Sequence, residues 1–215
     1  MKKNIYFNAL FLLKNKQGSL SSKIIKTNLN EIHKKDHVII KGDYSCLNYK
    51  DILLLNGNPG LVRKFPHIPG IDYAGKIVFS PSKKLKKNQK VIILARPLGV
   101  ENMGGLSQYI SVPANWVSKL PVGLSDKKSM MFGTAGFTAV LTILKIIKDK
   151  NLDKKKPILI IGGTTGVGLI CSIILDNLKY KTITSVRKGN KKILLKKTKL
   201  KNFVNLSEIN HGESF

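Results

Sequence analysis

The sequence predicts a mixed α/β protein, with a unit of short β-strands followed by a partial parallel α/β unit. Two observations lead to this prediction. In the first half, β-rich runs are separated by glycine and proline, which favours a small barrel or sandwich. After Pro121 strand-like and helix-like segments alternate, which is typical of a parallel sheet covered by helices. A loop over residues 113–125 separates the two patterns, and we expect domains at residues 1–120 and 121–215.

The expected elements follow in chain order. In the first unit, runs rich in β-branched and aromatic residues predict strands at 5–13, 38–44, 76–79, 91–95 and 106–112, and a helical segment begins near Tyr49. In the second unit, Ser125 is placed to cap a short helix over 126–132, and one apolar stripe of Val140, Leu141, Leu144 and Ile147 predicts a helix over 137–150. The remaining pattern predicts a strand at 158–161, a helix at 167–178, a strand at 182–186, a helix at 191–198 and a strand near 203–206.

The composition is that of a globular protein with a core, because 42% of the 215 residues are hydrophobic and 23% are charged. The formal net charge of +26 raises the question of nucleic-acid binding. However, the arginines are only Arg63, Arg96 and Arg187, and the lysines are spread along the whole chain. Guanidinium groups are favoured for phosphate and base recognition. We therefore expect solvated lysine faces and no nucleic-acid partner.

The cysteines and the apolar runs indicate in which cellular compartment the protein is expected. Cys46 and Cys171 are far apart and lack a Cys-x-x-Cys partner, so neither a disulfide framework nor a zinc knuckle is expected. The apolar stretch near the N-terminus is interrupted by Asn8 and ends at Lys14, which favours a first strand over a signal peptide. No run reaches the roughly 18 apolar residues of a membrane span. We expect a cytoplasmic protein without a membrane partner.

A glycine-rich corner is the first candidate site. In "PILIIGGTTGVGLICSII", over residues 157–174, an apolar strand leads through glycines into a helix. A phosphate group needs backbone N–H groups and the N-terminus of a helix beneath it, with room for close approach. Gly163 and Gly168 take the first and third glycine positions of Gly-x-Gly-x-x-Gly, but Thr165 stands at the second. Two interpretations remain open: a phosphate loop, or a strand-to-helix turn whose glycines serve packing alone.

The segment after the next strand suggests which dinucleotide would bind. An acidic residue about 20 positions after the corner would hold the ribose 2′-hydroxyl of NADH, whereas a cation would hold the 2′-phosphate of NADPH. The sequence there, "ITSVRKGNKK", contains Ser185, Arg187 and Lys188 but no Asp or Glu. This pattern predicts NADPH, and the alternative is a basic loop in a basic protein.

Five blocks together resemble a known family: "CLNYKDILLLNG", "FPHIPGIDYAG", "GVENMGGLSQYISVP", "GTAGFTAVLTI" and "GGTTGVG". Their order and content are similar to the acryloyl-CoA reductase and quinone oxidoreductase branch of the zinc-independent medium-chain dehydrogenase/reductases. The resemblance implies a GroES-like β-barrel domain followed by a partial Rossmann domain. In zinc-using relatives a Cys lies near the position of Asn48 and a His-Glu pair follows the Pro-Gly. This chain has Ile71 and Asp72 where those relatives have the His-Glu pair, so we expect no metal.

The resemblance also implies a reaction and its residues. The reaction is addition of a hydride from NADPH to the β-carbon of an activated alkene such as acryloyl-CoA, with protonation at the α-carbon. Negative charge develops on the thioester oxygen and must be met by preorganised donors. The resemblance places Tyr49 against the nicotinamide, with Asn48 beside it as a candidate donor. Arg63 is a candidate for contact with substrate charge, or else a surface residue near a turn.

The family's dinucleotide contacts carry over to two segments. The phosphate loop corresponds to Thr164, Thr165, Gly166 and Val167. The 2′-phosphate group corresponds either to Val186, Arg187 and Lys188 or, shifted by one position, to Ser185, Val186 and Arg187. The two registers remain open.

The family pattern continues beyond Phe215, and about three strands of a six-stranded Rossmann sheet would be present here. We expect a fragment, a truncated product, or a chain whose remainder a partner supplies, and a homodimer only with the further C-terminal part. A quinone is the alternative substrate to an enoyl-CoA. A non-catalytic basic fragment that binds a dinucleotide or nucleic acid is the second hypothesis, and it predicts binding that weakens steeply with salt.

Overall fold

The computed structural model describes residues 4–57, 62, 64–153, 155–186, 198 and 200–205. The backbone divides into two compact units, Met1–Thr134 and Ala135–Phe215. The first is rich in antiparallel β-strands and the second contains a parallel α/β sheet, which confirms the mixed α/β prediction. The division lies after the expected boundary at residue 120, because the first helical turns after Pro121 belong to the first unit.

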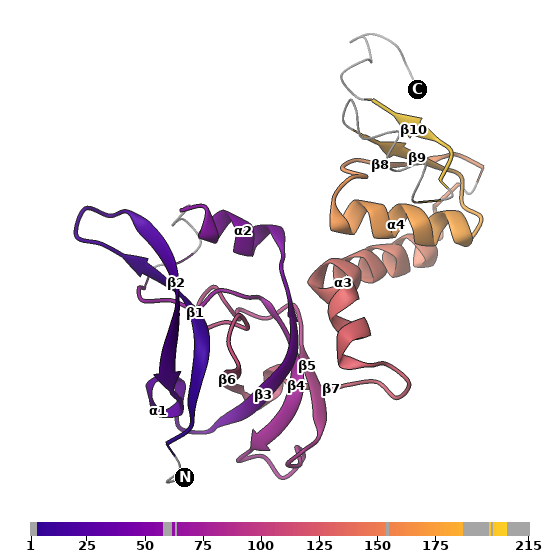
Figure 1. Cartoon of the computed structure of the whole chain (residues 1–215). Coiled ribbons are helices and arrows are strands. Elements are labelled where there is room, and N and C mark those ends of the chain that lie inside the picture. Colours follow the sequence, from indigo (N-terminus) through magenta and orange to yellow (C-terminus); the bar gives the residue numbers. More distant parts are fainter. Residues whose placement is uncertain are drawn as a thin grey trace. The chain divides into compact units, whose positions relative to one another are not determined.

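A five-stranded antiparallel sheet forms the main part of the first unit (Figure 1). Its strand order is β6-β3-β4-β5-β7, with bounds of Tyr109–Pro113, His37–Cys46, Asp72–Phe79, Lys90–Ile93 and Ser118–Lys119. The sheet positions strand β3, which leads directly into helix α2 (Tyr49–Leu55), and strand β4, which begins at Asp72. The predicted strands in this region are therefore present, although β4 begins earlier than the expected residue 76.

A β-hairpin of β1 (Tyr6–Lys14) and β2 (Leu20–Asn28) completes the strands of the first unit. Leu10 N donates a hydrogen bond to Leu106 O, and Gln108 N donates to Asn8 O, so β1 is attached to the segment that precedes β6. Within the described residues β2 pairs only with β1. Strand β2 was not predicted because its sequence, LSSKIIKTN, is largely polar and mostly exposed.

Two large apolar clusters fill the first unit, in addition to a small one of Leu12, Leu54 and Val62. One consists of residues from β3 to β6 and the loops beside them: Val38, Ile40, Tyr73, Ile77, Val91, Ile93, Leu98, Ile110 and Val112. The other joins β1 to short helix α1 (Leu29–Ile32) and contains Phe7, Ala9, Phe11, Leu29, Ile32, Ile39 and Ile68. A 3-10 turn, η2 (Ala114–Trp116), follows β6. The alternation of β3, with Val38 and Ile40 in one cluster and Ile39 in the other, shows that both of its faces are covered.

Helix α3 (Asp126–Lys148) is interrupted at Gly133, where the backbone has φ 53° and ψ −157°. A Cβ atom at this position would lie 2.6 Å from Asp72 Oδ2 and 2.8 Å from Cys46 Sγ, so only glycine fits. The two expected helices, 126–132 and 137–150, are thus the two parts of α3, and Ser125 Oγ accepts from Lys128 N as its predicted capping role requires. Among the described helices α3 alone is long and apolar enough to cross a membrane, but the break leaves each part shorter than the about 20 residues of a span.

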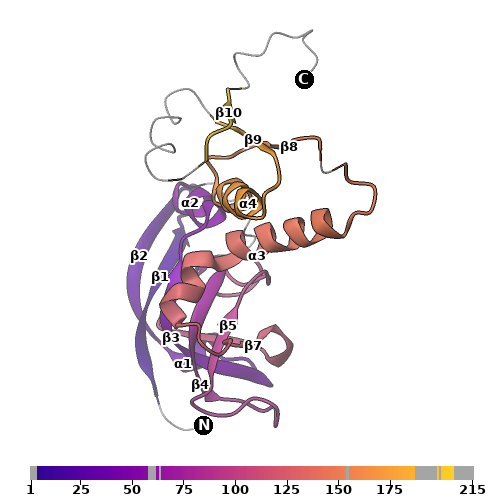
Figure 2. The ribbon, with the colours of Figure 1, turned by 90° about the vertical axis from the view of Figure 1, so that its right-hand side faces the viewer.

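The second unit has a three-stranded parallel sheet of order β10-β9-β8, with bounds of Phe203–Val204, Thr182–Ser185 and Ile158–Ile160. Helix α4 (Gly166–Asn177) connects β8 to β9 and lies along one face of this sheet in both views (Figures 1 and 2). Ala139, Ile143, Ile160, Cys171 and Leu175 form the core. The expected helix at 191–198 lies outside the described residues, apart from Thr198.

The apolar stripe predicted on α3 lies at the surface of the second unit. Its side chains are 44–52% exposed, namely Val140, Leu141, Leu144 and Ile147. The buried side of the helix contains Ala139 and Ile143 instead. The helix therefore carries apolar residues on two sides, and only one side contributes to the core of this unit.

Candidate functional site

The glycine corner connects β8 to α4 as the sequence predicts. Thr165 is the N-cap of α4: its hydroxyl accepts a hydrogen bond from Gly168 N at 3.2 Å and donates one to Gly162 O at 2.8 Å. Ser185, at the end of β9, is buried, and its hydroxyl accepts from Gly162 N at 2.9 Å. Gly163 N donates to Ser185 O at 3.0 Å. The corner is thus fastened to β9 and to the first turn of α4.

The two glycines that match the dinucleotide pattern have no room for a side chain. A Cβ atom on Gly163 would lie 2.0 Å from Thr184 Cγ2, and one on Gly168 would lie 2.3 Å from Gly162 O. The close packing of strand, corner and helix therefore requires both residues, whether or not a ligand binds. The packing interpretation of these glycines and the phosphate-loop interpretation are compatible.

The remaining loop residues are at the surface or beside it. Thr164 and Gly166 are exposed and Val167 is half-buried. The Thr165 hydroxyl accepts the hydrogen bond of the Gly168 N–H group. The N–H groups of Gly166 and Val167 are therefore the donors of the first turn that an anion could use. This geometry can hold a phosphate at the positive end of α4. Arg187 and Lys188 lie outside the described residues, and the choice between the two registers stays a prediction.

Thr165 offers a direct test of the corner. We expect Thr165→Ala to lower the free energy of unfolding of the second unit by about 1 kcal/mol, because the N-cap acceptor is lost. Thr165→Gly should cost only a few tenths of a kcal/mol, since glycine is tolerated at this position. Urea unfolding followed by circular dichroism measures both. Equal losses for the two variants would contradict the capping role.

Tyr49 and Asn48 lie at the start of α2 in the first unit. Tyr49 is the first helical residue and is 74% exposed. Asn48 is the N-cap, and its backbone N donates to Asp51 Oδ2 at 2.8 Å. The other oxygen of Asp51 accepts from Gly70 N at 2.9 Å. Asp51 is fully buried, and burial raises the pKa of its carboxyl group, although these hydrogen bonds oppose the shift.

A second buried carboxylate, Asp72, gathers donors from three chain segments. Asp72 Oδ2 accepts from Cys46 Sγ at 3.0 Å, from Asn48 Nδ2 at 2.9 Å and from Thr134 N at 2.8 Å, and Oδ1 accepts from Thr134 Oγ1. Thr134 Oγ1 in turn accepts from Ala95 N at 3.1 Å. We call Asp72, Cys46, Asn48 and Thr134 the Asp72 node. It joins the end of β3, the start of α2, the start of β4 and the break in α3.

The Asp72 node determines what two of its members, Asn48 and Cys46, can do chemically. Asn48 Nδ2 is directed at Asp72 and lies 3.6 Å from Cys46 Sγ, so Asn48 could donate to a substrate only by exchanging these partners. Burial first, and then the Asp72 carboxylate, raise the pKa of the Cys46 thiol to about 12. Cys46 is therefore a protonated donor at neutral pH and not a nucleophile. Arg63, the third expected residue, lies outside the described residues.

Sequence reasoning missed Asp51 and the Asp72 node because burial and long-range contacts decide them. One signal was available. Asp72 stands inside the apolar run "GIDYAG" at the start of a strand, and a carboxylate in such a run is unusual unless it has partners. Its donors come from positions 24 to 62 residues away, which no local pattern can identify.

His67 is buried in the first unit and serves the structure. Its Nε2 lies 2.9 Å from Gly99 O, and its backbone pairs with Leu12 of strand β1. Burial lowers the pKa of the imidazole. Because it lies in the core and is hydrogen-bonded to a backbone carbonyl, it is a neutral donor. No group of three His, Cys, Asp or Glu side chains that could hold a metal occurs among the described residues.

The lowered pKa of His67 predicts a pH dependence of stability. As the pH falls below about 6.5, the unfolded chain takes up a proton on this histidine before the folded chain does, so stability falls with decreasing pH. We expect His67→Gln, which keeps a donor near Gly99 O, to reduce this slope between pH 6.5 and 5. Urea midpoints measured across this range test it, with His33→Gln at an exposed site as the control. An unchanged slope in His67→Gln would contradict the assignment.

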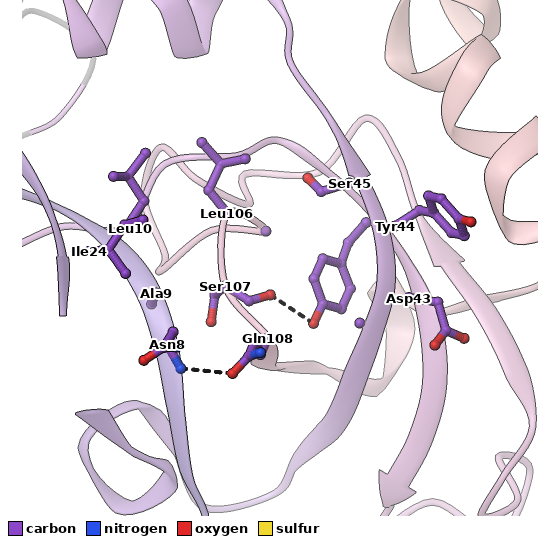
Figure 3. A pocket seen from close by; sticks show the side chains of 13 residues that line it. Asn8, Ala9, Leu10, Ile24, Asp43, Tyr44, Ser45, Leu106, Ser107 and Gln108 are labelled. Carbon is purple, nitrogen blue, oxygen red and sulfur yellow. Dashed lines mark hydrogen bonds between the residues drawn. The ribbon is translucent and has the colours of Figure 1, made fainter. Parts of the chain in front are cut away.

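A cavity of about 520 Å³ opens between the hairpin and β3 in the first unit (Figure 3). Leu10, Ile24 and Leu106 supply its aliphatic wall. Tyr73 Oη donates to Ser107 O at 3.2 Å, and Asn8 N donates to Gln108 Oε1 at 2.8 Å, so these polar groups are already paired. The volume suits a small organic molecule. Among the described residues, none of the candidate site residues named from the sequence lines this cavity.

Comparison with known proteins gives three results. Residues 34–122 match the alcohol dehydrogenase GroES-like domain. The acrylyl-CoA reductase AcuI of Ruegeria pomeroyi is 36% identical over 176 residues, which cover 81% of this chain and 53% of AcuI. The Bacillus subtilis protein YhfP is 40% identical over 167 residues, which cover 78% of this chain and 50% of YhfP. The chain thus spans about half the length of these curated relatives.

Solved structures agree with the sequence relatives. The crystal structure of YhfP with NAD bound has a TM-score of 0.87 and 34% identity, covering 97% of this chain and 63% of YhfP. The YhdH oxidoreductase of Salmonella enterica in complex with NADP has a TM-score of 0.88 and 27% identity, covering 96% of this chain and 63% of YhdH. Both matches cover almost the whole chain.

Proposed function

Because the chain belongs to the medium-chain dehydrogenase/reductases, we propose that it takes part in the NADPH-dependent reduction of an activated C=C bond, with an enoyl thioester such as acryloyl-CoA as the substrate. The observation that carries this proposal is the likeness to AcuI over 81% of the chain, which includes the blocks around Tyr49 and the glycine corner. The likeness covers about half of AcuI, so the whole reaction is a proposal for this chain.

The corner supplies the dinucleotide-binding part of the proposal. The N–H groups of Gly166 and Val167 at the start of α4 would hold a pyrophosphate, and Thr164 offers an exposed hydroxyl beside them. Thr165 serves this site by holding the first turn of the helix, since its hydroxyl is used as the cap. Bound NADPH would supply the hydride. These residues would bind and orient it, and none of them exchanges a proton.

The choice of NADPH over NADH rests on the sequence after β9. Two related proteins were solved with NAD and NADP respectively, which supports a nicotinamide dinucleotide of either kind. No carboxylate follows β9 up to Lys192, whereas Arg187 and Lys188 are cations. Ser185 is buried and its hydroxyl accepts a hydrogen bond from Gly162 N. Binding of the 2′-phosphate in the register that starts at Ser185 would have to break this bond, whereas the register that starts at Val186 leaves it intact.

In the first unit, Tyr49 would contact the nicotinamide. Its ring is exposed at the start of α2, and the residue before it is held by two carboxylates. A small-molecule substrate and a cytoplasmic location complete the proposal. Arg63 stays a candidate for contact with substrate charge. The likeness to AcuI supports an enoyl thioester, whereas the likeness to YhfP, named as a quinone oxidoreductase, supports a quinone as the competing acceptor.

Binding and turnover test the proposal separately. NADPH and NADH are titrated in parallel, with protein fluorescence and melting temperature as the signals. We expect NADPH to bind at least tenfold more tightly, and Arg187→Ala with Lys188→Ala to remove this preference while Lys179→Ala does not. Oxidation of NADPH is then followed at 340 nm with acryloyl-CoA, with a quinone and without acceptor. Absence of NADPH binding would overturn the proposal, and oxidation with the quinone alone would replace the substrate class.

A further inference from the structure

The Asp72 node buries a carboxylate that receives neutral donors only. The Asp72 side chain is 0% exposed and accepts four hydrogen bonds, from a thiol, an amide, a backbone N–H and a hydroxyl. No lysine or arginine among the described residues bonds to it. Each of these four groups carries a hydrogen that it can donate, which suits a carboxylate acceptor. Burying a carboxylate without a cation costs free energy of folding. A functional demand on its position would explain why it is kept.

We propose that Asp72 is a positioning residue, which fixes the Asn48 amide and with it the start of α2, where Tyr49 is exposed. The inference rests on the proposed function, in which Tyr49 contacts the nicotinamide. It adds a residue that would touch neither cofactor nor substrate and would act through Asn48.

The orientation of Asn48 follows from the chemistry of its partners. Because a carboxylate cannot donate, the NH₂ end of the amide must face Asp72. The backbone N–H of Asn48 is held at the same time by Asp51, which is itself anchored to Gly70 N. The side chain and the main chain of one residue are thus fixed by two different buried carboxylates. Tyr49 follows directly in sequence, so its Cα position depends on both.

Stability alone does not account for this arrangement. Replacing buried ionic groups by apolar ones of similar volume is often neutral or stabilising, whereas removing one partner of a buried network is costly. A core position at the start of β4 beside Tyr73 could hold an apolar side chain. Unlike an apolar side chain, a carboxylate at this position orients the hydrogen-bond donors around it. Functional sites require such fixed orientation of their side chains.

A double-mutant cycle on the whole chain tests the inference. Asp72→Asn, Asn48→Ala and the double variant are compared by NADPH titration at a temperature where circular dichroism shows each to be folded. Asp36→Asn, at an exposed loop position of the same unit, is the control. We expect each single variant to weaken NADPH binding at least tenfold and the double variant to bind no more weakly than the weaker single, because both changes remove the same contact.

Each outcome decides between explanations. Additive losses, or a lower melting temperature of Asp72→Asn with unchanged NADPH affinity, would overturn the positioning role and leave the proposed function standing. Failure of the unaltered chain and of Asp36→Asn to bind NADPH would remove the proposed function and the inference that rests on it. If Asp72→Asn does not fold, the cycle is run with Asp72→Glu, which keeps the charge but displaces both oxygens.

Alkylation of Cys46 tests the node without a nucleotide. In a Cys171→Ala background, iodoacetamide reacts only with Cys46. Asp72 is one of the causes that raise the pKa of this thiol, after burial, so Asp72→Asn should increase the alkylation rate at pH 9. An unchanged rate would show that the carboxylate does not hold the thiol, and would overturn the inference at its first step.

Discussion

Gly168→Ala is expected to reduce NADPH affinity at least tenfold and to lower the free energy of unfolding of the second unit by about 2 kcal/mol. The added methyl group would lie 2.3 Å from Gly162 O and 3.2 Å from Gly163 Cα, both of which are backbone atoms. Relief requires the first turn of α4 to move away from the corner. That movement displaces the N–H groups of Gly166 and Val167, which the proposed pyrophosphate site uses.

Gly166→Ala is the matched control for this prediction. It adds the same methyl group to the same turn, but its nearest neighbour is the Ala135 Cβ atom at 3.3 Å, a contact that needs a shift of only a few tenths of an ångström. We expect a cost below about 1 kcal/mol and binding within threefold of the unaltered chain. Urea unfolding and NADPH titration measure both variants. Similar losses at the two positions would mean that any side chain in the turn is harmful, and the argument from close approach would fail.

Tyr49→Ala should weaken NADPH binding or slow hydride transfer at least tenfold without changing stability. The ring is 74% exposed, so its removal deletes little packing and should alter the free energy of unfolding by less than about 0.5 kcal/mol. Contact of a buried aromatic ring with a ligand contributes on the order of 1.5–3 kcal/mol, which corresponds to roughly a tenfold to hundredfold change in affinity. The NADPH dissociation constant and the melting temperature are measured on the same sample.

Two further tyrosine variants separate the contributions at this position. Tyr49→Phe keeps the ring, so retained binding would assign the effect to ring contact and lost binding would assign it to the hydroxyl. Tyr44→Ala removes another exposed tyrosine ring from the same unit and should leave NADPH affinity unchanged. A Tyr49→Ala variant that binds and transfers hydride normally would rule out the proposed contact.

Much of the fold follows from local pattern. Strand β3 is predictable because β-branched residues dominate "HVIIKGDY", and the two parts of α3 are predictable because Ser125 and the apolar periodicity mark them. Strand β2 escapes such reasoning, since a polar strand is indistinguishable from a loop until its partner is known. The direction in which α3 buries its residues was also beyond reach, because both Val140 and Ala139 belong to plausible apolar stripes.

In the candidate site, too, features set by neighbouring residues could be predicted and features set by long-range contacts could not. The glycine corner could be found because its residues are close in sequence and their order carries the chemistry. The role of Thr165 as a helix cap was missed, although a threonine directly before a helix is a recognised capping signal. The contacts of Asp72 could not be found at all, because its partners become neighbours only when β3, β4 and the break in α3 come together.

Strand β2 combines an edge that is unpaired among the described residues with charged side chains of the kind that oppose edge-to-edge association. The hairpin presents one strand whose outer side has no partner within the described part of the chain, and such a side can recruit strands of other molecules. Exposed Lys23 and Lys26 flank the two isoleucines at its centre. When two copies meet along this strand, the lysines bring like charges together before backbone pairing can begin. Part of the positive charge of this chain therefore lies where it opposes pairing of two copies along β2.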